Sequence, residues 1–98
     1  MKIKGLMKTR LSNKKLVYFL WDDIYIGQRI ALGKYEPYET KLAQVAVKDG
    51  VVVDVGANIG YYTLVLADKA KKIYAIEPEE TNFALLEKNL KINRIGNV

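Results

Sequence analysis

The sequence predicts an α/β fold in which a small β-hairpin precedes a βαβ unit and one further helix. Residues 51–55 and 72–76 are short runs rich in β-branched residues, separated by one helical pattern and followed by another. An aromatic and β-branched run at residues 16–21 follows the turn-forming pair Ser12-Asn13, which is typical of a hairpin. The length of 98 residues allows one small domain with a modest core.

Composition excludes several classes of protein. Hydrophobic residues make up 50% of the chain and charged residues 28%, an ordinary globular balance. The absence of Cys and His excludes disulfides, Cys/His zinc sites and catalysis by either side chain within this chain, and we predict no metal site. No apolar run approaches the ~18 residues of a membrane span, and no apolar secretory segment follows the basic start. We therefore expect a cytoplasmic protein without membrane contact.

Residues 1–34 are predicted to be a β-rich extension. Residues 2–10 and 16–21 would be its two strands, and Asp22-Asp23 would end the second. Residues 24–30 fit either a short helix or a further strand. Gly33 marks a loop before the main unit.

A helix is predicted at the start of the second part, residues 35–98. Pro37 suits the first turn of a helix. Leu42, Val45 and Ala46 recur at the helical spacing, so residues 38–48 would form an amphipathic helix with these three side chains facing the core.

The remaining elements alternate between strand and helix. Residues 51–55 form a nearly continuous β-branched run, as expected of a strand buried on both faces of a parallel sheet. A helix at 61–70 and a parallel strand at 72–76 would complete the βαβ unit. Thr81 can cap a last helix that ends near Asn93, with three apolar side chains on one face: Phe83, Leu86 and Leu90.

The loop after the first of these parallel strands is the most informative segment. Ligands of open α/β sheets bind outside the carboxyl ends of the strands, where this loop lies. Gly56 lets the backbone turn sharply and approach a ligand, and Gly60 keeps the entrance to the next helix free of a side chain. Free backbone N–H groups at that entrance favour an acceptor or anion.

Two acids give this loop its chemistry. Glu77 ends the second strand, 23 positions after Asp54, where its two oxygens can accept both hydroxyl groups of a ribose. Asp54 precedes the first glycine, where it repels a pyrophosphate and suits an ammonium or sulfonium ion. The P-loop ending and the three-glycine dinucleotide fingerprint are both missing. The charges therefore favour S-adenosylmethionine over NAD. Alternatively, Asp54 only braces the loop and Glu77 only caps the next helix.

These segments together resemble the class I S-adenosylmethionine-dependent methyltransferases of the FkbM type. The similarity covers about residues 35–98 and also includes Tyr35-Glu36-Pro37. It rests on three further segments: residues 52–63 (Val-Val-Asp-Val-Gly-Ala-Asn-Ile-Gly-Tyr-Tyr-Thr), 74–78 (Tyr-Ala-Ile-Glu-Pro) and 86–93 (Leu-Glu-Lys-Asn-Leu-Lys-Ile-Asn).

The resemblance implies a doubly wound, Rossmann-like sheet of seven strands. Residues 35–98 would then be the N-terminal half of a domain that binds S-adenosylmethionine. The implied activity is methyl transfer, typically to a hydroxyl group of a small molecule or sugar, and no catalytic residue is assigned within this chain. The implied cofactor residues are Asp54, Gly56, Asn58 and Gly60 along the methionine part, Glu77 at the ribose, and Glu36 from the preceding loop.

The resemblance covers only the cofactor half of such an enzyme, so we expect a truncated unit that is inactive alone. Without the next strand of the sheet, residues 51–55 would have an unpaired apolar edge. We therefore expect self-association or a second half that completes the sheet.

Two other functions remain open. The net charge of +5 comes from residues 1–15, which hold six basic side chains and no acid, and residues 89–93 also resemble some tRNA methyltransferases. An RNA or tRNA methyltransferase is thus one alternative, although a basic strand edge is also a common solvated feature. The other alternative is a non-catalytic interaction module derived from a methyltransferase.

Overall fold

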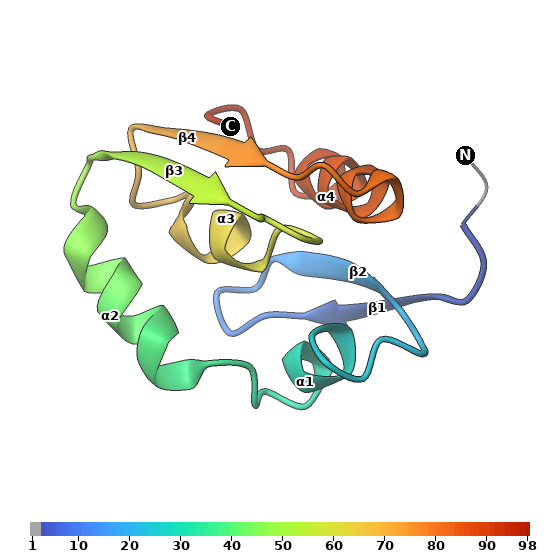
Figure 1. Cartoon of the computed structure of the whole chain (residues 1–98). Coiled ribbons are helices and arrows are strands. Elements are labelled where there is room, and N and C mark those ends of the chain that lie inside the picture. Colours follow the sequence, from blue (N-terminus) through green and yellow to red (C-terminus); the bar gives the residue numbers. More distant parts are fainter. Residues whose placement is uncertain (1–2) are drawn as a thin grey trace.

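The computed structural model describes residues 3–98, and Lys2 of the predicted first strand lies outside them. Figure 1 shows the elements in chain order, with a hairpin followed by a parallel βαβ unit, which confirms the predicted fold class. The elements are β1 (Leu6–Arg10), β2 (Leu16–Leu20), α1 (Gly27–Ala31), α2 (Pro37–Val47), β3 (Val51–Val55), α3 (Tyr61–Leu66), β4 (Lys72–Ile76) and α4 (Glu80–Ile92). Within residues 3–98, no helix is both long and apolar enough to cross a membrane.

The hairpin forms where the sequence predicted it. β1 and β2 pair antiparallel, with Lys8 opposite Tyr18. The turn is closed by the Asn13 side chain, which accepts a hydrogen bond from Lys15 N–H at 3.1 Å. The segment at 24–30 resolves as a turn followed by the short helix α1, which begins at Gly27. A Cβ on Gly27 would lie 2.8 Å from the Phe19 ring, so a glycine lets this helix pack closely on β2.

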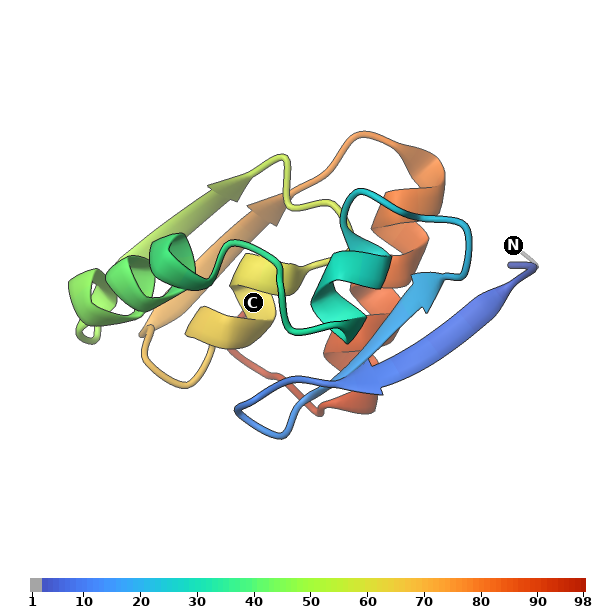
Figure 2. The ribbon, with the colours of Figure 1, turned by 90° about the horizontal axis from the view of Figure 1, so that it is seen from below.

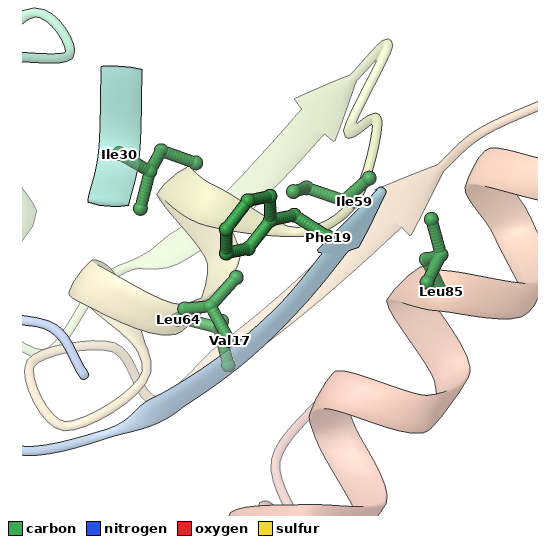
Figure 3. Packing of buried hydrophobic residues seen from close by; sticks show 6 residues of the cluster. All are labelled: Val17, Phe19, Ile30, Ile59, Leu64 and Leu85. Carbon is green, nitrogen blue, oxygen red and sulfur yellow. The ribbon is translucent and has the colours of Figure 1, made fainter. Parts of the chain in front are cut away.

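The main core joins the hairpin to the βαβ unit. Buried side chains from β2 and α1 meet others from the loop before α3, from α3 and from α4 (Figure 3). The hairpin is therefore part of the same core as the parallel unit. The cluster consists of Val17, Phe19, Ile30, Ile59, Leu64 and Leu85.

Two asparagines of α4 occupy the free edge of β2. The Asn89 amide accepts from Tyr18 N–H at 2.6 Å and donates to Tyr18 C=O at 3.2 Å. The Asn93 amide does the same for Leu16, at 2.8 and 2.7 Å. Since the two asparagines are one helical turn apart, they match alternate residues of the strand. α4 therefore satisfies this strand edge much as a neighbouring strand would.

The second sheet is covered on one face only. β3 and β4 pair in parallel, and α2 and α3 lie on the same side of them (Figures 1 and 2). On the other face, Val51, Val53 and Val55 are 60–76% exposed, beside exposed Tyr74 and Ile76. The prediction that this strand is buried on both faces is therefore wrong for the described residues, because no element of residues 3–98 covers the second face.

The predicted faces of two helices need correction. On α2, Leu42, Val45 and Ala46 are exposed; the helix instead turns Thr40, Ala43, Gln44 and Val47 inward, toward α3 and the sheet. Spacing alone could not distinguish the two faces, because small and polar side chains make this close contact.

On α4 the predicted cap is also wrong. Glu79, not Thr81, is the N-cap, and its carboxylate accepts from the N–H groups of Thr81 and Asn82. Phe83 is 43% exposed, while Leu85 and Leu86 are buried. The helix ends at Asn93, as predicted.

Candidate functional site

The candidate site lies at the carboxyl ends of β3 and β4. Because the strands are parallel and Val55 pairs with Ile76, both ends meet at one edge of the sheet. The loop that follows β3 folds over the end of β4, where Gly56 N–H and Ala57 N–H both donate to Ile76 C=O at 2.9 and 3.0 Å. The loop between β3 and α3 is therefore held in one position by backbone bonds.

Gly56 gives the loop its open side. Its φ of 71° is a left-handed conformation that glycine adopts without strain. A Cβ built on Gly56 meets no atom within 4 Å, so the space above this residue is free for a ligand. Asn58 is also left-handed, at φ 53°, and its side-chain amide donates back to Gly56 C=O at 3.2 Å.

Glu77 joins the two strand ends. Its Oε1 accepts from Asn58 N–H at 2.8 Å and its Oε2 accepts from Glu79 N–H at 2.9 Å. Each carboxylate oxygen has a second acceptor position, so Glu77 can still accept two hydroxyl groups. The alternative that Glu77 only caps the next helix is wrong, since Glu79 is the cap. The backbone hydrogen bonds that Glu79 accepts, first from Asn82 and then from Thr81, lower the pKa of Glu79.

Asp54 is oriented by α3. The Thr63 hydroxyl, fully buried, donates to Asp54 Oδ2 at 2.8 Å. This bond holds β3 against α3, whereas the alternative interpretation expected Asp54 to brace the loop. It uses one carboxylate oxygen, and no hydrogen bond from residues 3–98 reaches the other, Oδ1.

Gly60 is required by packing between helices. It begins α3 at φ 100°, and a Cβ there would lie 2.7 Å from Leu86 Cδ1 of α4. Nearby, the Asn82 amide donates to Asn58 Oδ1 at 3.2 Å. The start of α3, the loop and the first turns of α4 are therefore in direct contact.

Glu36 reaches this region through a tyrosine. It is the N-cap of α2 at φ 41°, and its Oε1 accepts from Tyr62 Oη at 2.5 Å. Burial and this hydrogen bond raise the pKa of Tyr62, so its phenol stays protonated as the donor. Since Tyr62 lies in the first turn of α3, it places Glu36 beside the helix that follows Gly60.

Hydrogen bonds thus join three predicted residues directly, since Asn58 binds both Gly56 and Glu77. Asp54 and Glu36 are each bound to α3, through Thr63 and Tyr62, and Gly60 is the N-cap of that helix. Sequence reasoning assigned no role to Tyr62 or Thr63. Both follow the glycine loop directly, and their hydroxyl groups beside two predicted acids were the available signal.

The site is rich in uncompensated negative charge. Among the described residues, the only ion pair joins Lys15 to Asp68, neither of which belongs to the candidate site. The carboxylates of Asp54, Glu77 and Glu36 are therefore not paired with a basic side chain. A ligand that combines a cation with hydroxyl donors fits this arrangement.

Comparison with known proteins agrees with this chemistry. Residues 32–98 match the family model described as the TRM5/TYW2 methyltransferase domain. The chain is 32% identical over 96 residues to tRNA (guanine(37)-N(1))-methyltransferase Trm5b of Methanocaldococcus jannaschii, covering 95% of this chain and 27% of that protein. It is 42% identical over 60 residues to tRNA(Phe) (4-demethylwyosine(37)-C(7)) aminocarboxypropyltransferase of the same organism, covering 59% of this chain and 24% of that protein.

A solved structure shows the same fold with a cofactor. The crystal structure of M. jannaschii TYW2 in complex with AdoMet superposes with a TM-score of 0.76 at 29% identity, covering 100% of this chain and 43% of that one. AdoMet is S-adenosylmethionine, so the predicted cofactor is confirmed for the family. The matching family model is that of a methyltransferase domain, which agrees with the predicted family at this coarser level, whereas the FkbM type is not supported.

The chain is short beside these relatives. It spans between 21% and 32% of the length of the curated proteins it resembles. Those proteins therefore contain much that has no counterpart in residues 1–98.

Proposed function

Since the chain belongs to the TRM5/TYW2 methyltransferase domain family, we propose that residues 35–98 are the S-adenosylmethionine-binding part of an enzyme that modifies tRNA. The observation that carries the proposal is Glu77, held by Asn58 N–H and Glu79 N–H at the carboxyl ends of β3 and β4 with acceptor capacity left over. The names of the relatives support tRNA as the substrate, in place of the small-molecule or sugar acceptor expected from the FkbM resemblance.

Each residue of the site has a stated part in this proposal. Glu77 accepts the two ribose hydroxyls. Asp54 directs Oδ1 toward the cationic methionine part, while Thr63 holds Oδ2. Gly56 provides an approach without a side chain, and Glu36 adds negative charge from the start of α2.

The cofactor, when bound, supplies a methyl group on a positively charged sulfur. The residues of this chain bind and orient it, and none of them is assigned to the transfer itself. Residues that activate the acceptor atom of the tRNA would come from the parts of the relatives that this chain does not span.

The test is cofactor binding by the 98-residue chain, measured from the backbone amide resonances in solution. Millimolar S-adenosylmethionine is expected to shift the amides of Gly56, Asn58 and Glu79, which line the site. Shifts confined to other residues would contradict the site. If millimolar S-adenosylmethionine shifts no amide resonance, the cofactor proposal is contradicted and the interaction-module alternative is favoured.

A ligand pair tests the ribose contact without disturbing the protein. Adenosine is expected to bind several-fold more tightly than 3′-deoxyadenosine, because the second lacks one hydroxyl of the pair. Glu77→Ala should abolish this preference, while the matched control Glu80→Ala, an exposed acid in the first turn of α4, should keep it. If both variants prefer adenosine over 3′-deoxyadenosine to the same extent, Glu77 does not contact the ribose.

A second candidate, aminocarboxypropyl transfer from the same cofactor, is favoured by the relative of 42% identity. Both candidates share the binding site, and they differ in the mass added to the tRNA. The tRNA is incubated with the protein and S-adenosylmethionine and then digested. Mass spectrometry of the digest distinguishes the two added groups.

A further inference from the structure

Two lysines from distant parts of the chain converge on one aromatic ring. Lys8 of β1 places Nζ 5.7 Å from the centroid of the Tyr18 ring, and Lys88 of α4 places Nζ 4.6 Å from it. Lys8 is the cross-strand partner of Tyr18, and the Asn89 amide fixes Tyr18 to α4. The fold therefore brings two ammonium groups to the same aromatic ring, one from β1 and one from α4.

One further basic side chain continues this pair along α4. Lys91 lies one helical turn from Lys88 and is exposed. We call this the hairpin–α4 basic surface, and it consists of Lys8, Lys88 and Lys91.

Protection of a strand edge explains only half of this surface. Lysines on β1 discourage pairing with another strand. Lys88 and Lys91 stand on a helix, which has no such edge to protect. Among the described residues neither Lys8 nor Lys88 has an ion-pair partner, so no carboxylate compensates the two positive charges at the Tyr18 ring.

We propose that the hairpin–α4 basic surface contacts the phosphate backbone of RNA. The choice of RNA rests on the proposed function, and the surface itself rests on the geometry around Tyr18. A polyanion can place one phosphate near each of the two unpaired ammonium groups. Contacts of this kind carry no base specificity, so they position the tRNA while other parts of the enzyme select the base.

The experiment measures binding of a fluorescently labelled, unmodified tRNA transcript to the 98-residue chain as salt is varied. The test variant is Lys8→Gln/Lys88→Gln. The matched control is Lys34→Gln/Lys41→Gln, which removes the same charge beside and on α2, across the molecule from α4 in Figure 1. Circular dichroism melts check that both variants fold.

Loss of two phosphate contacts should flatten the salt dependence. Between about 50 and 200 mM KCl, the wild-type chain should lose about tenfold more affinity than the test variant, since each contact contributes close to one unit of slope. The control should keep a slope nearer that of the wild type. Equal loss in the two variants would overturn the proposal, because it would reduce the effect to net charge.

Two further readouts separate this proposal from others. Both variants should keep the amide shifts induced by S-adenosylmethionine. If those shifts occur and the test variant binds tRNA like the wild type, the surface is wrong and the cofactor site stands. If the lysine pair instead controls binding to phosphatidylserine vesicles with no effect on tRNA, the surface serves a membrane and the RNA proposal is overturned.

Discussion

Replacing Asn89 with leucine tests whether α4 holds the hairpin by hydrogen bonding or by apolar packing. Asn89 is fully buried and forms three hydrogen bonds: from Tyr18 N–H at 2.6 Å, to Tyr18 C=O at 3.2 Å and to Ile59 C=O at 2.7 Å. Leucine is similar in size but supplies no polar atom, so the substitution leaves three backbone groups without these partners. Because Ile59 precedes α3, the change affects the site loop as well as β2.

The magnitude follows from the three groups. A buried polar group left unpaired costs about 1–3 kcal/mol, and water can reach some of the carbonyls, so the expected loss is about 3–6 kcal/mol. Domains of this size have about 5–15 kcal/mol of unfolding free energy in total. We therefore expect the Asn89→Leu chain to be partly or largely unfolded at room temperature. Asn93→Leu is the matched control; it affects a half-buried residue one turn further along, and about 1–2 kcal/mol is expected.

Urea denaturation followed by far-ultraviolet circular dichroism measures both variants. The midpoint should fall much further for Asn89→Leu than for Asn93→Leu, at a similar slope of free energy against urea. In the Asn93→Leu chain the Tyr18 amide should remain protected from hydrogen exchange. A loss for Asn89→Leu below about 1 kcal/mol would refute the reasoning, because it would mean that apolar packing alone docks the hairpin.

Three further outcomes are expected. Gly60→Ala should lower the unfolding free energy by about 1–3 kcal/mol in urea titrations, because the added Cβ would clash with Leu86 and the φ of residue 60 is positive. An unchanged unfolding free energy would show that α4 shifts to accommodate the Cβ without cost. The raised pKa of Tyr62 predicts that stability is present below its ordinary pKa of 10.0 and falls as pH rises above it, so melts at increasing alkaline pH should separate wild type from a flatter Tyr62→Phe chain; parallel curves would contradict this. The exposed valine face of β3 predicts concentration-dependent self-association in sedimentation experiments, reduced by Val53→Lys; a monomer at high concentration would contradict it.

The sequence was sufficient for the strands and helices of the βαβ unit and for the position of its candidate site at the carboxyl ends of the two strands. The β-branched runs at β3 and β4 and the glycines between them depend on backbone preferences that act over a few residues. The spacing from Asp54 to Glu77 follows from the length of a βαβ unit, so the carboxyl ends of the strands could be placed together before any coordinates were known. The segment of α1 remained open, because its few residues favour neither state and Phe19 decides the matter by packing against Gly27.

The sequence did not predict which face of α2 is buried or which side chains contact α3. The apolar spacing of Leu42, Val45 and Ala46 predicted the wrong side of α2, since the structure uses Thr40 and Gln44 against α3 instead. Such a contact depends on the shape of the neighbouring helix, which the periodicity of one segment does not contain.

By itself, the sequence determined the order of strands and helices, the acidic glycine loop and the cofactor chemistry that suits it. Only the tertiary structure decided that Glu77 binds the loop through Asn58 N–H, that Asn89 joins α4 to β2, and that Lys8 and Lys88 meet at Tyr18. The physical reason is distance along the chain. Propensity and spacing act between near neighbours, whereas these contacts join residues about 10 to 70 positions apart and exist only when the whole core has formed.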